Sequence, residues 1–258
     1  MILYVRRTGI DPGAAEAPRG NAALMESKGA LFREVLFDYA EEQGILVPKK
    51  PEAFRYAYGA HGKPFFDTPP LSSVRFSISH SGQCWAAIFH TAAVGLDIED
   101  VSATGRHSGY DRARFERIAA RFFSPDERSH LRDAADASAA KERFFKIWTR
   151  KEAYMKYTGN GFSEAPERFS VIAPMAEGRR DGADADARGK AVRRKRTPGA
   201  RGREGRDDAA FRVDVAADRG ARVFDANGDA IPGVRVFDLF LETGLRCACC
   251  RNAGTAGP

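Results

Sequence analysis

The stretch FSISHSGQCWAAIFHTAAVGLDIE, residues 76–99, indicates most about the fold of this chain. Residues 76–80 and 84–90 have the composition of β-strands, and the Ser-Gly-Gln sequence between them is typical of a hairpin turn. A third strand is expected at residues 94–99. Residues 76–90 are therefore expected to form a β-hairpin that a further strand follows.

Helices and strands are expected on both sides of this stretch. The spacing of apolar residues predicts a first helix that ends near Gly44. Ser124, Pro125 and Glu127 form the signature of a capped helix start, with a reciprocal capping box. We expect strands at 2–5, 54–58, 169–172, 211–215, 222–224, 234–240 and 246–249, helices at 22–43, 110–123, from 124 onwards and at 141–157, and a loop at 59–70. Both halves combine helices with strands, which predicts an α+β fold.

The composition is that of a globular protein. The chain has 258 residues, of which 43% are hydrophobic and 10% aromatic, enough for one large domain or two small ones. No stretch is long and apolar enough for a membrane helix, and the start lacks the pattern of a signal peptide. We therefore expect a cytoplasmic protein that does not contact membranes. Four cysteines are too few for a disulfide scaffold, and Cys247 and Cys249 are expected on a buried strand rather than at a metal ion.

The net charge of +6 is concentrated in one segment. Residues 178–206 contain 11 Lys and Arg against 4 Asp and Glu, a local charge of +7, which leaves the rest of the chain at −1. Because residues 176–210 are mostly Gly, Ala, Arg and Asp, we expect a disordered basic insertion there. It could contact an acidic partner; no aromatic residues alternate with its arginines, which argues against nucleic-acid binding.

A pair of acidic residues ends the strand at 94–99. Side chains alternate on a strand, so Asp97 and Glu99 share one face while Leu96 and Ile98 share the other. Oxygen ligands at this spacing suit a hard divalent cation such as Mg²⁺. The alternative is an edge strand with a solvated acidic face.

The longest helix contains charged residues in an apolar setting. Trp148, Lys151 and Met155 fall within one narrow stripe, so a lysine lies among large apolar side chains. Glu152 and Lys156, one turn apart, lie on the flank of that stripe. A Glu-x-x-x-Lys pair is ordinarily an exposed ion pair on a helix surface, and this is the alternative here. Lys151 on the apolar side makes this instance less ordinary, because a partly buried cation and carboxylate need partners.

A third group combines a loop with the first hairpin. Ser79, His80 and the nearby backbone N–H groups could donate to phosphate oxygens, and Lys63, followed by Pro64, adds a cation. The alternative for His80 is a structural residue at the end of a strand.

The order of these motifs resembles that of the 4′-phosphopantetheinyl transferases of the surfactin-synthetase type. The motifs are GKP at 62–64, FSISHSG at 76–82, GLDIE at 95–99, RFFSPDE at 121–127 and WTRKEAYMKYTGNG at 148–161. The similarity runs from about residue 63 to 171 and is weaker over 234–249. The pairing of GLDIE with WTRKEAYMK at this separation is its most specific feature.

The resemblance implies an enzyme that transfers the 4′-phosphopantetheine arm of coenzyme A to a serine of an apo carrier protein and releases adenosine 3′,5′-bisphosphate. It also implies two similar α+β lobes related by a pseudo-twofold axis, each a small antiparallel sheet packed with helices. These lobes would be residues 1–95 and 96–258, with coenzyme A and Mg²⁺ between them. A monomer is expected, because one chain supplies both lobes.

By the same resemblance, three acidic side chains would bind the cation: Asp97, Glu99 and Glu152. Lys151 and Lys156 would neutralise the pyrophosphate, and Lys156 would take part in catalysis. Glu152, directly or through water, is the expected base for the carrier serine.

The resemblance assigns the remaining candidates to coenzyme A and to the reaction. Ser79 and His80 would hold its phosphates, with His80 also contributing to catalysis, and Lys63 with Pro64 would line the adenine end. Glu127 is a second candidate for the base, although the capping box predicts that it points into its own helix end.

One difference from the family pattern leaves an alternative function open. The basic segment that relatives carry after the first strand is shorter here, and Arg7, Arg19 or Lys28 would have to replace its phosphate-binding residues. The alternative is a catalytically weak relative that binds coenzyme A or carrier protein without efficient turnover.

Overall fold

The computed structural model describes residues 1–7, 29–47, 55–67, 69–102, 111–174, 210–214, 220–239, 241 and 244–253. The helices are α2 (Gly29–Glu42), α3 (Arg112–Phe122), α4 (Pro125–Arg132) and α5 (Ala137–Thr158). The strands are β1 (Ile2–Arg7), β2 (Tyr56–Tyr58), β3 (Pro64–Phe66), β4 (Arg75–Ser81), β5 (Cys84–His90), β6 (Val94–Asp100), β7 (Ala210–Asp214), β8 (Ala221–Phe224), β9 (Ala230–Leu239) and β10 (Leu245–Asn252). Short 3-10 turns lie at Leu71–Ser73, Gly161–Glu164 and Pro166–Arg168.

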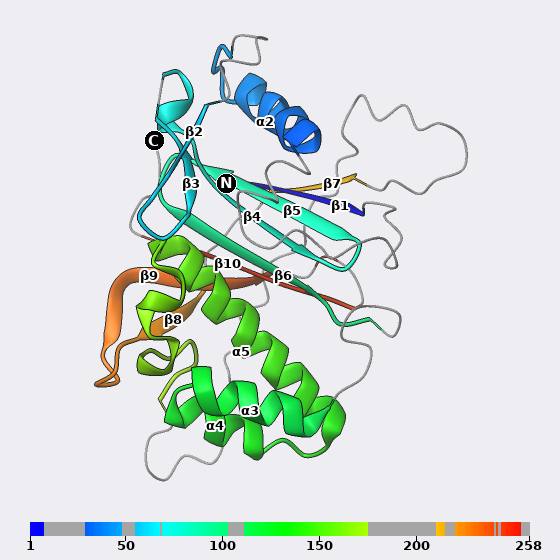
Figure 1. Cartoon of the computed structure of the whole chain (residues 1–258), viewed down its shortest axis with the longest axis vertical. Helices are drawn as coiled ribbons and strands as arrows, with labels where there is room; N and C mark the ends of the chain where they lie inside the picture. Colours follow the sequence, from blue (N-terminus) through cyan, green and yellow to red (C-terminus); the bar gives the residue numbers. More distant parts are fainter. Residues whose placement is uncertain are drawn as a thin grey trace.

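Two antiparallel sheets of four strands form the centre of the molecule. Their strand orders are β4-β5-β1-β7 and β6-β10-β9-β8. Leu3 and Ile88 of the first sheet and Leu96 and Cys249 of the second belong to one buried cluster, so the sheets pack face to face. Figure 1 shows α2 on the outer side of the first sheet and α3, α4 and α5 on the outer side of the second. The predicted combination of helices with antiparallel sheets is therefore confirmed.

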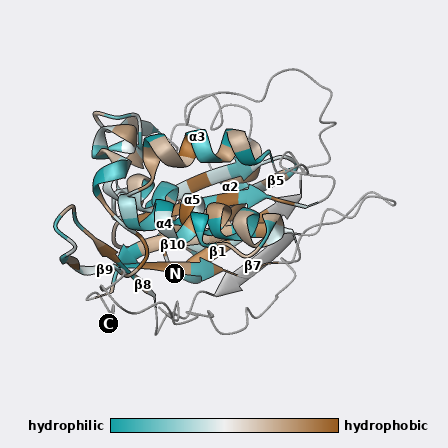
Figure 2. Cartoon of the chain, turned by 90° about the horizontal axis from the view of Figure 1, so that it is seen from below, coloured by the Kyte–Doolittle hydropathy of each residue, from teal (hydrophilic) through white to brown (hydrophobic). Residues whose placement is uncertain are grey.

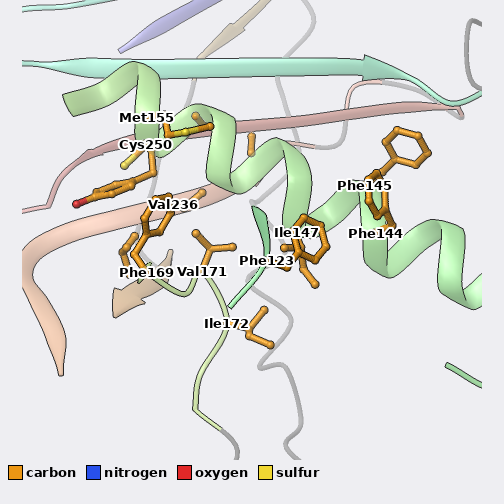
Figure 3. Packing of buried hydrophobic residues seen from close by; sticks show 14 of the residues in the cluster. Phe123, Phe144, Phe145, Ile147, Met155, Phe169, Val171, Ile172, Val236 and Cys250 are labelled. Atoms are coloured by element: carbon orange, nitrogen blue, oxygen red, sulfur yellow. The ribbon is translucent and has the colours of Figure 1, made fainter. Parts of the chain in front are cut away.

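Each outer face of the sheets has a hydrophobic core of its own. An aromatic cluster that includes Phe32, Phe76 and Phe89 joins α2 to the first sheet. Between α5 and the second sheet lie side chains such as Met155, Val236 and Cys250 (Figure 3). In Figure 2, α3 and α4 carry hydrophilic next to hydrophobic residues, as expected of amphipathic helices that cover a core.

Helix α5 is fixed closely to the second sheet. The Arg150 guanidinium donates from Nε and Nη2 to the two carboxylate oxygens of Asp238 on β9, at 2.9 and 2.6 Å. At Gly95 on β6 there is no room for a side chain, because a Cβ would collide with the Ala153 carbonyl oxygen and the Tyr157 backbone of α5. The absence of a side chain at Gly95 thus brings the acidic end of β6 next to α5.

Most of the predicted elements are present. The hairpin of β4 and β5, strand β6, the three helices α3, α4 and α5, and the complete capping box at Ser124 and Glu127 are confirmed. The expected loop at 59–70 is partly wrong, because Pro64–Phe66 forms β3 and pairs with β2. The expected strand at 169–172 is reduced to one bridge between Ser170 and Phe224, and 3-10 turns precede it.

Some expectations concern residues that the structure does not describe. The first helix begins at Gly29, and its expected part at 22–28 lies outside the described residues, as does the expected insertion up to residue 209. The lobe division at residue 95 stays a prediction. β7, from late in the sequence, pairs with β1 of the first sheet. Among the described residues, no helix has the length and apolar character to span a membrane.

Candidate active site

The two acidic residues of β6 lie where predicted relative to their strand. Leu96 and Ile98 belong to the buried cluster between the sheets, so Asp97 and Glu99 occupy the opposite face. Asp97 is 5% exposed, whereas Glu99 is half-buried. The predicted alternation along this strand is confirmed, and the alternative of a fully solvated acidic face does not hold for Asp97.

Strands β4 and β6 and helix α5 meet at Asp97. The Lys156 ammonium donates to Asp97 Oδ1 at 2.7 Å and to Ser79 Oγ at 3.0 Å. The Ser79 hydroxyl donates to the same Asp97 oxygen at 2.9 Å. Lys156 keeps 26% of its side chain exposed, so this group of residues is accessible from solvent. One carboxylate therefore joins three elements that lie far apart in the sequence.

Electrostatic coupling extends the group to Glu99 and Glu152. Burial, together with the Glu99 and Glu152 carboxylates, raises the pKa of Asp97 to about 7, against the opposing effect of Lys156. Burial and Glu99 likewise raise the pKa of Glu152, which Lys156 opposes. Burial alone would lower the pKa of Lys156, but Asp97, Glu152 and Glu99 raise it above its ordinary value. Asp97, Glu99 and Glu152 thus each influence the charge of Lys156, and their convergence on one cation stays a prediction.

The carboxylate oxygens of Asp97, Glu99 and Glu152 are the type of ligand that a divalent cation such as Mg²⁺ prefers. Asp97 Oδ2 is buried and has no hydrogen-bond partner. Within the described ranges, no three His, Cys, Asp or Glu side chains come close enough to form a complete metal cage. Magnesium, however, is usually bound through one or two carboxylates plus substrate phosphates, so a partial set of oxygen ligands meets its needs.

Lys151 and Glu127 lie apart from this group and form a buried ion pair. Their charged atoms are 2.7 Å apart, and the two side chains are 1% and 0% exposed. Lys151 also donates to the Phe169 carbonyl at 2.6 Å, while Glu127 accepts from the backbone N–H groups of Ser124 and Val171. Both side chains are thus engaged with each other and with backbone groups, and a role of Lys151 at the pyrophosphate or of Glu127 as the base stays a prediction. The structure gives them a supporting role, which joins α4 and residues 169–171 to α5.

Lys63 and Pro64 lie near Lys156, but their own contacts are with other parts of the chain. Lys63 Nζ donates to the carbonyls of Val94 and Tyr157 at 2.9 and 3.2 Å, and burial lowers its pKa to about 8. Pro64 is buried at the start of β3. Both residues line a cavity of about 60 Å³ whose wall also includes Lys156 and Met155. The structure therefore brings them to the boundary of the candidate site, with the Lys63 ammonium bonded to backbone.

His80 is not brought into the group. Alternation along β4 places it on the face opposite Ser79 and Ser81, where it is half-buried. Sequence reasoning missed Ser81, whose hydroxyl donates to Glu99 Oε2 at 2.7 Å. The signal was available, because serines at 77, 79 and 81 give β4 one polar face.

Comparison with known proteins shows what the sequence around these residues is similar to. Residues 93–183 match the family model of the 4′-phosphopantetheinyl transferase superfamily. The chain is 32% identical to 4′-phosphopantetheinyl transferase HetI of Nostoc sp. over 51% of this chain and 52% of that protein. It is also 32% identical to 4′-phosphopantetheinyl transferase psf-1 of Bacillus pumilus over 57% of both chains, and 33% identical to 4′-phosphopantetheinyl transferase Sfp of Bacillus subtilis over 45% and 46%.

The chain spans about half the length of the curated relatives that it matches. The matched region contains Asp97, Glu99, Glu152 and Lys156. The resemblance predicted from the motifs is thereby confirmed: over this region the chain is similar to the 4′-phosphopantetheinyl transferase superfamily.

Proposed function

We propose that the protein transfers the 4′-phosphopantetheine arm of coenzyme A to a serine of an apo carrier protein. The observation that supports this most is the meeting of Asp97 on β6 with Lys156 on α5, in a field shared with Glu99 and Glu152. The relatives named above carry this activity in their names. The two sheets would form two lobes related by a pseudo-twofold axis, with coenzyme A between them.

In the proposed reaction, the carrier serine oxygen forms a bond to the β-phosphorus of coenzyme A. The bond from that phosphorus to the bridging oxygen breaks, and adenosine 3′,5′-bisphosphate leaves with the electron pair. Glu152, directly or through water, takes the serine proton as the general base. Lys156 offsets the charge that builds on the phosphate oxygens.

Asp97 and Glu99, with Glu152, would hold a magnesium ion. Such an ion supplies positive charge to the pyrophosphate oxygens. The buried Asp97 Oδ2, which has no hydrogen-bond partner, supports this assignment. The cavity beside Lys63 and Pro64 would take part of coenzyme A. A cytoplasmic location, a monomeric state and a contribution of His80 to phosphate binding remain predictions.

The test is to incubate the protein with coenzyme A, Mg²⁺ and several apo carrier proteins, and to follow the carrier mass. We expect the mass of the added arm. Glu152→Gln should lower the rate about 10²-fold or more, because a positioned base contributes this much. Glu142→Gln is the matched control, since Glu142 lies on the same helix and forms an exposed ion pair with Arg246.

The results separate the proposal from its alternative. Coenzyme A or carrier binding without any gain of mass would indicate the weak relative that binds without turnover. A Glu152→Gln variant that works as fast as Glu142→Gln would remove Glu152 from the reaction.

A further inference from the structure

Three serines on β4 contact the backbone of β6, although the two strands belong to different sheets. The hydroxyl oxygens of Ser77, Ser79 and Ser81 accept from the N–H groups of residues 96, 98 and 100, at 3.1, 3.3 and 3.0 Å. Side chains thus supply, between the sheets, the hydrogen bonds that a backbone ladder supplies within one. All three serines are buried.

Ser79 and Ser81 each donate a second hydrogen bond, to a carboxylate of β6, and Ser77 does not. Ser79 donates to Asp97 Oδ1 at 2.9 Å, and Ser81 donates to Glu99 Oε2 at 2.7 Å. The corresponding position on β6 opposite Ser77 is Gly95, which has no carboxylate. The serines therefore share one backbone contact and differ in whether a carboxylate of β6 is within reach.

The double contact fixes the orientation of each carboxylate. A serine hydroxyl has one proton to donate and lone pairs that accept. The β6 N–H group holds the serine Oγ in place. The O–H group of the same serine can therefore bond the carboxylate in one orientation only. One Asp97 oxygen is occupied by Ser79 and Lys156, and Oδ2 is left buried without a hydrogen-bond partner.

We infer that Ser79 and Ser81 are positioning residues that orient Asp97 and Glu99 toward a divalent cation, whereas Ser77 only joins the two sheets. This inference rests on the proposed function, and it differs from the expectation that Ser79 holds a phosphate of coenzyme A. Residues that orient metal ligands typically change metal affinity about 10- to 100-fold when they are replaced.

Ser81→Ala and Ser77→Ala make a matched pair. Each variant loses one buried hydroxyl and one bond to a β6 N–H group, and only Ser81→Ala also removes a hydrogen bond to a carboxylate of β6. Binding of Mn²⁺ in the presence of coenzyme A, followed by electron paramagnetic resonance, reports on the cation site without turnover. Thermal unfolding without metal reports on the contact between the sheets.

We expect both variants to lose similar thermal stability, and Ser81→Ala alone to bind Mn²⁺ about tenfold more weakly. In a Glu99→Gln background, Ser81→Ala should weaken Mn²⁺ binding no further, because the oriented carboxylate is already gone. Ser81→Thr, which keeps the hydroxyl, should restore binding. If Ser81→Ala does not fold, Ser79→Ala gives the same comparison through Asp97.

Equal Mn²⁺ affinities for Ser81→Ala and Ser77→Ala would overturn the inference, as would an unchanged effect of Ser81→Ala in the Glu99→Gln background or a wild-type protein that binds no Mn²⁺. Failure of the proposed function is a separate result, since it shows as absent arm transfer by the wild-type protein with every carrier tested.

Discussion

At the scale of single residues, the ion pair of Lys151 and Glu127 is the most consequential buried charge. The sequence placed Lys151 in an apolar stripe, and the structure confirms that it is 1% exposed with a carboxylate beside it. Burial lowers the pKa of Lys151, and Glu127 opposes that effect. Removing one partner of such a pair leaves a buried charge without compensation.

We therefore predict that Glu127→Gln destabilises the protein by about 3 kcal/mol or more. Glu142→Gln removes the same type of group from an ion pair whose side chains are 62% and 30% exposed, and should cost less than about 1 kcal/mol. Guanidinium denaturation of both variants measures the difference. Equal losses would show that the buried pair contributes no more than an exposed one.

The pH dependence of Glu127→Gln has a definite sign. Without Glu127, burial lowers the pKa of Lys151 against the smaller opposing effect of Glu167, so this pKa in the folded state falls further below the value in the unfolded chain. The unfolded chain then binds more protons at alkaline pH, and stability rises with pH in that range. The destabilisation by Glu127→Gln should thus shrink as the pH is raised from neutral toward 10, which denaturation curves at several pH values would record.

At the scale of elements, the site depends on how closely α5 approaches β6. We predict that Gly95→Ala displaces the helix, because the added Cβ meets backbone atoms of Ala153 and Tyr157, which cannot rotate away. Glu152 and Lys156 adjoin these two residues, so the rate of arm transfer should fall. The free energy of unfolding should also fall, by about 1–3 kcal/mol. Gly59→Ala is the control, since its Cβ would lie 3.7 Å from the nearest atom.

Transfer rates and guanidinium denaturation of both glycine variants test this prediction. A Gly95→Ala variant with wild-type stability and transfer would mean that the helix can move away from β6 without cost to the site.

Elements with strong local signals could be predicted, and those that depend on distant contacts could not. The capping box of α4 and the hairpin of β4 and β5 depend on neighbouring residues, and both were predicted. Strand β3 has three residues and exists through its pairing with β2, so a local pattern does not reveal it. The expected strand at 169–172 lacks a long partner and forms a single bridge with Phe224.

The candidate site shows the same division. Alternation along β6 predicted that Asp97 and Glu99 share a face, and the helical stripe predicted a buried Lys151. That β6 meets α5 was accessible only through resemblance to a family, because 59 residues separate Asp97 from Lys156. The second bond of Ser81, to Glu99, required the placement of β4 against β6, which no local pattern contains.

At the scale of the whole molecule, the distribution of charge predicts how the protein would meet the proposed carrier. Residues 178–206 carry a local charge of +7 while the rest of the chain is at −1, so the segment would attract a carrier protein that is acidic. Attraction between the segment and a carrier would speed their encounter without changing the chemical step. Deleting 178–206 should therefore raise KM for the carrier in a salt-dependent way.

A substitution tests this more cleanly than the deletion. Deletion leaves six residues between Pro174 and Ala210, where β7 begins, and could strain the pairing of β7 with β1. Replacing Arg193, Arg194, Lys195 and Arg196 by Gln removes four charges at constant length.

We expect KM for an acidic carrier to rise by roughly tenfold at low ionic strength, with kcat unchanged. At about 1 M salt, where charges are screened beyond roughly 3 Å, the difference should disappear. A KM that is unchanged, or that rises equally at all salt concentrations, would assign the segment no electrostatic part in carrier binding.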